Sequence, residues 1–207
     1  MKISVSRLEG FSDALIAIVM TLMVLEIPLP SIINLDTMFG FLKSILIYFA
    51  SFIIVGSQWN RHHKMLDDIE YVSNSFVWKN IVWLFTLSLI PLFMKWVLIY
   101  PKSVIPALLY AFIYLLNDFI MRVLFINILK EKNGSLFIRK FKRDRNKTDI
   151  KRLLLMVFYI VLVFSIAAVI SEASIVLFII LPVIMSLSNI FKDENEFPLS
   201  RERILLK

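Results

Sequence analysis

Cysteine is absent from this sequence of 207 residues, and glycine, with four residues, and histidine, with two, are scarce. Without cysteine the chain can form neither disulfide bonds nor thiolate metal sites. It also lacks a His-Glu-x-x-His pair, a Gly-x-Ser-x-Gly turn and an acidic metal cluster within an apolar run. Since these patterns carry the common hydrolytic sites, we expect a protein that is not an enzyme and that needs no cofactor.

Long apolar runs dominate what is present. Hydrophobic residues make up 59% of the chain, and several runs reach the length of about 20 residues that crosses the hydrocarbon core of a bilayer. We therefore expect an all-α integral membrane protein with one transmembrane domain over residues 1–207. The candidate spans are residues 11–28, 41–59, 75–100, 104–129, 153–170 and 173–191.

The formal net charge of +7 lies mostly in connections beside these spans. Basic residues precede the first span, follow the second, recur after the sixth, and crowd the connection 130–152. Lysine and arginine are retained on the cytoplasmic side of membranes, so both termini should be cytoplasmic, as an even number of spans also requires. This rule accounts for the charge better than nucleic-acid binding does, and the stretch 139–152 would also attract anionic lipid headgroups.

The start of the first span carries polar groups that an ordinary membrane anchor does not need. Arg7, Ser12 and Asp13 lie directly before or within the beginning of the apolar run. Ionisable groups at a bilayer are costly and usually mark a functional site. The alternative for Ser12 and Asp13 is an N-cap that satisfies the free N–H groups of the helix start.

One face of the same span is continuous and apolar. At about 100° per residue, Ile18, Leu22 and Leu25 share a face, with Phe11 on the same side and Thr21 at its edge. Spacing alone favours ordinary helix packing, and the lining of a cation pore is the other interpretation. Asp13 projects to nearly the opposite side, toward neighbouring helices.

Glu26 follows this face at the end of the first span. In a symmetric assembly its carboxylates would form a ring that concentrates cations at a pore mouth. A solvated interfacial residue is an equally good interpretation. Elsewhere, we expect Trp83 to pack inside the bundle and Asp118 to pair with Arg122, four residues further along a helix.

The segment Arg7 to Asp13 reads R-L-E-G-F-S-D, and it resembles the R-x-x-x-F-S-D signature of the lysosomal-type potassium channels, the transmembrane protein 175 family. The continuation to Pro28 and the segment Trp59 to His63, W-N-R-H-H, are also similar to that family, and Asn80 and Pro91 match less specific positions. Bacterial and archaeal members have one six-helix repeat per chain. A bacterial member would lie in the cytoplasmic membrane.

This resemblance implies a potassium-selective leak channel. Bacterial members are homotetramers in which the first helix of each subunit lines a central pore. The positions that would constrict it are Ile18, Leu22 and Leu25, and Thr21 matches a position linked to selectivity. A polar network would hold the pore helix; its residues would be Arg7, Ser12, Asp13, Trp59, His62, His63 and Asn80.

The sequence limits how such a channel would select its ion. No Thr-Val-Gly-Tyr-Gly segment is present, so a filter made of carbonyl rings is excluded. Permeant K⁺ would have to be selected by side chains and by dehydration at a constriction. His62 and His63 are adjacent and cannot chelate one metal as an i, i+4 pair would, so we expect structural hydrogen bonds from them and no metal site.

Two other functions stay open. A proton-coupled small-cation transporter would use Asp13, His62 and Asp118 as carriers, although charge within the spans is scarce and no inverted repeat of the kind found in many transporters is visible. A structural membrane protein would not need the charged start of the first helix.

Overall fold

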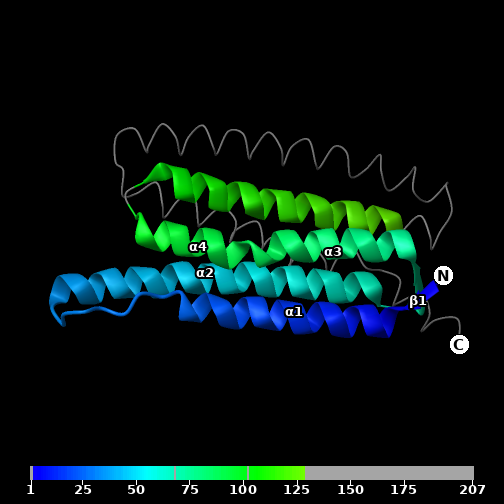
Figure 1. The fold of residues 1–207 in the computed structure, drawn as a ribbon, viewed down its shortest axis with the longest axis horizontal. Helices are drawn as coiled ribbons and strands as arrows, with labels where there is room; N and C mark the ends of the chain where they lie inside the picture. The colour runs from blue at the N-terminus through cyan, green and yellow to red at the C-terminus, as the bar shows by residue number, and fades with distance from the viewer. Residues whose placement is uncertain (1, 68, 102, 129–207) are drawn as a thin grey trace, which may run out of the picture.

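The computed structural model describes residues 2–67, 69–101 and 103–128 (Figure 1). The fifth and sixth predicted spans, 153–170 and 173–191, and the basic stretch 139–152 lie outside these residues. The elements in chain order are β1 (Lys2–Ser4), α1 (Val5–Leu25), α2 (Leu35–Leu66), β2 (Tyr71–Ser73), α3 (Asn74–Ser88), α4 (Ile90–Ile99) and the helix Val104–Ile128.

By length and composition, four helical segments of the described chain could cross a membrane: α1, α2, the nearly continuous pair α3 and α4, and the helix Val104–Ile128. These correspond to the first four predicted spans, and they confirm an integral membrane protein built of apolar helices. In Figure 1 they lie side by side along the long axis of the molecule, with α1 beneath α2 and the other helices above.

The ends of the first two spans differ from the prediction. Helix α1 begins at Val5 and ends at Leu25, and α2 runs from Leu35 to Leu66 instead of over 41–59. The N-terminal end of α2 is set by Asn34, which accepts a hydrogen bond from the Thr37 N–H in a reciprocal capping box. Hydropathy does not reveal these ends, because helices continue through polar residues whose side chains find partners in the bundle.

The third predicted span is divided into α3 and α4 at Leu89. Pro91 lies in the first turn of α4, where its missing N–H costs no intrahelical hydrogen bond. The helix resumes at once, since the Phe93 N–H donates to the Leu89 carbonyl at 3.2 Å. Pro91 thus lies directly after a break between two successive helices.

A short antiparallel ribbon was not predicted. Strands β1 and β2 pair with Ile3 opposite Val72, and the Val5 N–H donates to the Glu70 carbonyl at 3.0 Å. Three-residue strands are too short to show an alternating pattern, and their partners lie far apart in the sequence. The regular secondary structure of the described chain is therefore helical except for this ribbon, which ties the start of α1 to the start of α3.

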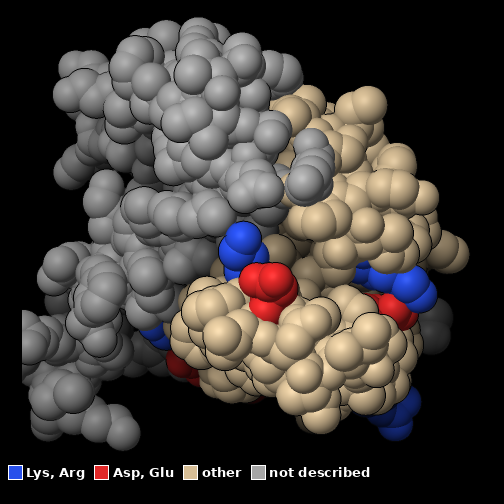
Figure 2. All heavy atoms as spheres, turned by 90° about the vertical axis from the view of Figure 1, so that its left-hand side faces the viewer, with Lys and Arg blue, Asp and Glu red and all other residues tan. Residues whose placement is uncertain are grey.

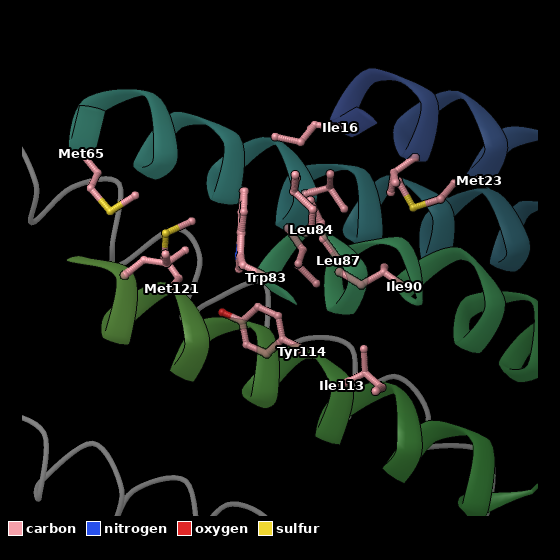
Figure 3. Packing of buried hydrophobic residues seen from close by; sticks show 14 of the residues in the cluster. Ile16, Met23, Met65, Trp83, Leu84, Leu87, Ile90, Ile113, Tyr114 and Met121 are labelled. Carbon is pink, nitrogen blue, oxygen red and sulfur yellow. The ribbon is translucent and has the colours of Figure 1, made fainter. Parts of the chain in front are cut away.

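The core lies where α1, α2, α3, α4 and the helix Val104–Ile128 meet. Its fully buried side chains include Met23, Ile54, Leu87 and Met94. Figure 3 shows Trp83 directed toward the helix Val104–Ile128, close to Tyr114. Trp83 is 0% exposed, which confirms its predicted place inside the bundle.

Candidate functional site

A chain of buried polar side chains starts on α1. The Ser12 hydroxyl donates to the Leu8 carbonyl at 2.8 Å, so its oxygen is available to accept the Asn80 amide N–H at 2.9 Å. The Asn80 carbonyl oxygen then faces His62 Nε2 at 2.8 Å. Because that oxygen can only accept, Nε2 carries the proton. Ser12, Asn80 and His62 are each 0% exposed, and together they connect α1, α3 and α2.

The same chain continues to the fourth membrane helix. The His62 ring stacks on the Trp83 ring, with centroids 4.7 Å apart and an interplanar angle of 6°. The Trp83 indole N–H donates to Asn117 Oδ1 at 3.2 Å, and Asn117 Nδ2 donates to Thr86 Oγ1 at 2.9 Å. We call this set the central polar chain; its members are Ser12, Asn80, His62, Trp83, Asn117 and Thr86.

A second polar set joins α1 to α2 nearer the surface. The Trp59 indole N–H donates to Asp13 Oδ1 at 2.9 Å. The Trp59 ring lies nearly parallel to the His63 ring, with centroids 5.9 Å apart. His63 Nδ1 lies 2.6 Å from Glu9 Oε1. Asp13 thus points toward α2 and away from Ile18, as helical periodicity predicts.

The structure brings together most residues that the sequence assigned to a polar network, but in two sets. Ser12, His62 and Asn80 belong to the central polar chain, and Asp13, Trp59 and His63 belong to the second set. The N-cap interpretation of Ser12 and Asp13 is wrong, because α1 begins at Val5 and both residues lie well inside it. Their side chains bond across the bundle instead.

Arg7 is placed apart from both sets. It is exposed on α1, and within the part of the chain that the structure describes no hydrogen bond or ion pair joins its side chain to another residue. Phe11 is also exposed, on the side of α1 that carries Ile18.

Helix α1 has one anchored face and one exposed face. Ile18, Leu22 and Leu25 are 58%, 48% and 76% exposed, whereas Ile16 and Met23 are buried against the other helices. The spacing predicted that these three residues share a face, and their exposure places that face away from the other described helices. Ordinary packing of this face within the described part of the subunit is therefore excluded.

Thr21 lies on the exposed side of α1. Its hydroxyl is within hydrogen-bond distance of two carbonyls of the preceding turn, Ala17 at 3.1 Å and Ile18 at 2.9 Å. Its single proton is therefore used within the helix, and the lone pairs of its oxygen remain as acceptors. Such an oxygen suits a cation or a water molecule better than an anion.

Glu26 lies at the end of α1, where its carboxylate oxygen is 2.8 Å from Nζ of Lys95 on α4. The sequence allowed two interpretations of Glu26, a carboxylate at a pore mouth or a solvated interfacial residue. It did not predict a partner for this side chain. Lysine and glutamate on separate helices, far apart in the chain, leave no signal in spacing or hydropathy.

A third cluster is centred on Asp118 of the helix Val104–Ile128. The predicted pair is confirmed, since Arg122 Nε donates to Asp118 Oδ2 at 2.8 Å. Arg61 of α2 reaches the other carboxylate oxygen, a contact that sequence reasoning missed. Asp118 is 2% exposed. The arginine within W-N-R-H-H was the available signal, because a charge in an otherwise apolar helix requires a partner.

The sequence model of the family described as endosomal/lysosomal potassium channel TMEM175 matches residues 7–91. Over these residues the chain is similar to the TMEM175 family. The matched region contains most of α1, all of α2 and α3, and both polar sets apart from Asn117.

Individual relatives are named potassium channels. A potassium channel of Chryseobacterium sp. (strain P1-3) is 41% identical over 91 residues, which are 44% of this chain and 47% of that protein, so the match spans about half of the relative. A potassium channel of Chamaesiphon minutus is 27% identical over 153 residues, 69% of this chain and 73% of that protein.

A solved structure shares the fold. It is the crystal structure of a homologue of the lysosomal potassium-selective channel TMEM175 from Chamaesiphon minutus, and it aligns with a TM-score of 0.59 over 88% of this chain and 96% of that chain. The sequence identity is 23%. At that identity the likeness establishes the TMEM175-type fold alone.

Proposed function

We propose that the protein is a potassium-selective leak channel in which four copies of the chain surround a central pore lined by α1. The pore would be constricted by rings of Ile18, Leu22 and Leu25, with Thr21 beside them. Conduction would be passive, would need no cofactor, and would take place in a bacterial cytoplasmic membrane with both chain termini inside. Potassium is proposed as the permeant ion because the relatives are named potassium channels.

The observation that carries this proposal is the division of α1 into two faces. The inner face is fixed to the bundle by Ser12 and the buried apolar residues, while bulky apolar side chains cover the outer face. Such fixing would suit a helix that lines a narrow constriction, because small rotations of the helix would change the pore radius.

Rotational symmetry would convert this exposed face into a constriction. In a closed ring of identical subunits each residue occurs once per subunit at the same height, so Ile18 would become a ring of isoleucines. Apolar rings restrict ions by dewetting and dehydration. Removing water from Na⁺ costs more than removing it from K⁺, which gives the correct sign of selectivity. The Thr21 oxygens would lower the cost for the permeant ion.

The test is a reversal potential in liposomes with K⁺ on one side and Na⁺ on the other. We expect the wild-type current to reverse toward the K⁺ potential and the Ile18→Asn variant to reverse closer to zero. Leu46→Asn is the matched control, since Leu46 is equally exposed on α2 (59%) but lies outside the proposed pore face. Its reversal potential should equal that of the wild type.

Absence of current above that of empty liposomes would overturn the channel, and so would concentrative flux that requires a proton gradient. The second outcome would indicate the proton-coupled transporter. That alternative is not favoured, because the named relatives are channels and because its three carriers are held by neighbours: Asp13 by Trp59, His62 by Asn80, and Asp118 by Arg61 and Arg122.

A further inference from the structure

The described residues at the end of the bundle opposite the N-terminus include few charged ones. Figure 2, which views this end, shows a mainly uncharged surface with blue and red atoms adjacent in a few places. Among the described residues its acidic side chains are Glu26 and Asp36 and its basic ones Lys43 and Lys95. One charge more or less therefore changes the electrostatic character of this end.

Glu26 occupies an unfavourable position for a carboxylate. It is the C-cap residue of α1, and the last turn of α1 holds no basic residue. A helix C-terminus carries a partial negative charge that repels anions, so helix stability does not explain a glutamate there. The compensation comes from another helix, because Nζ of Lys95 on α4 lies 2.8 Å from the Glu26 carboxylate.

This ion pair is accessible to ions. The Glu26 side chain is 32% exposed and the Lys95 side chain 47% exposed. Glu26 directly follows Leu25, which is the most exposed of the three residues proposed to constrict the pore. In a symmetric assembly around α1, each subunit would bring one Glu26 and one Lys95 to the same mouth.

We propose that Lys95 limits conductance by neutralising Glu26 at the mouth of the pore. The inference rests on the proposed channel function and adds a residue to it. An unpaired ring of carboxylates would raise the local concentration of K⁺ and with it the rate of ion arrival. With Lys95 in place each carboxylate is offset by an ammonium group, so the mouth attracts cations weakly.

The influence of the Lys95 charge on conductance should depend on ionic strength. The screening length is about 30 Å at 0.01 M salt but about 3 Å at 1 M, so a charge at the mouth acts on arriving ions only in dilute solution. Removing the Lys95 charge should therefore increase K⁺ conductance at 0.01 M by about threefold. At 1 M the increase should disappear.

The experiment measures single-channel K⁺ conductance in planar bilayers at 0.01 M and 1 M KCl. Lys95→Gln should conduct more than the wild type at low salt, and Glu26→Gln should conduct less, because it leaves the ammonium group alone. The double variant Glu26→Gln/Lys95→Gln should resemble the wild type. Lys43→Gln is the matched control, since it removes one positive charge from the same end without releasing Glu26, and its low-salt conductance should change less.

Each result separates the inference from the channel function. If the wild type carries no current, the proposed function fails and this inference fails with it. If the wild type conducts but Lys95→Gln equals Lys43→Gln at low salt, only the inference is overturned. If Lys95→Gln does not assemble, Glu26→Gln decides, because an unchanged low-salt conductance in that variant also overturns it.

Discussion

The imidazole ring of His62 lies almost parallel to the indole ring of Trp83, with 4.7 Å between their centroids. Each ring also takes part in a hydrogen bond at its edge, His62 with Asn80 and Trp83 with Asn117. The stack therefore joins two groups of hydrogen bonds into one continuous chain. Through it the position of α1 is linked to the helix Val104–Ile128, although other helices lie between them.

Asn80 is the residue whose loss should disturb this chain most. Substitution by alanine leaves the buried His62 Nε2–H without an acceptor and removes the donor to Ser12. An unsatisfied buried polar group costs about 1–3 kcal/mol. We expect Asn80→Ala to lower the melting temperature in detergent clearly. Asn127→Ala is the control, because Asn127 is partly buried and bonds a carbonyl of its own helix, and its effect should be smaller.

Ser12 and Ser44 form a natural pair for a second test. Both hydroxyls donate to the carbonyl four residues earlier, at 2.8 Å and 3.1 Å, but Ser12 also accepts from Asn80. Ser12→Ala should therefore cost about 1 kcal/mol more than Ser44→Ala in thermal unfolding. Equal melting temperatures would show that the contact between α1 and α3 adds nothing to stability.

Trp83 and Trp78 differ in burial and permit a third comparison. Trp83→Phe removes the indole N–H that donates to Asn117 and leaves a smaller ring against His62. We therefore expect the free energy of unfolding to fall by about 1–3 kcal/mol. Trp78 is 63% exposed, and Trp78→Phe should be nearly neutral. Thermal unfolding of the two variants measures the difference, and a neutral Trp83→Phe would contradict the role of the stack.

Arg61 lies near the polar C-terminal end of α2, and we expect it to contribute to stability through its contact with Asp118. Asp118 is buried, and removing one partner of a buried ion pair costs about 3–5 kcal/mol. Arg61→Leu should therefore reduce the yield of monodisperse protein and its melting temperature. Asp118→Leu should cost more, because it removes the carboxylate that both arginines share, whereas Arg122 still pairs with Asp118 in Arg61→Leu. If Arg61→Leu lowers the melting temperature as much as Asp118→Leu does, the shared carboxylate does not account for the loss.

The sequence predicted the features that local periodicity encodes. Apolar run length predicted the first four spans, the i, i+4 spacing predicted the Asp118–Arg122 pair, and the helical angle predicted that Asp13 points away from Ile18. Each of these depends on residues within a few turns of one helix. The resemblance to a known family then indicated which polar residues belong together.

Contacts between distant segments were not predictable in the same way. Arg61 and Asp118, Glu26 and Lys95, and the two strands of the ribbon meet only because helices pack side by side. The long polar end of α2 was missed for a related reason. The range from Arg61 to Leu66 contains too many polar residues for a span defined by hydropathy. Arg61, His62 and His63 nevertheless have partners on other elements, and Met65 and Leu66 are buried.

The ribbon of β1 and β2 helps to determine which side chains α1 presents. The hydrogen bonds of Ser12 and Asp13 hold α1 against its neighbours, and the ribbon holds the start of the helix. Successive residues of an α-helix are rotated by about 100° around its axis. A rotation of α1 by one residue would therefore bring Ala17 or Val19 to the place of Ile18. The register of Lys2 with Ser73, Ile3 with Val72 and Ser4 with Tyr71 fixes the first turn against that shift. Six residues of β structure thus act as the angular reference for a helix of 21 residues.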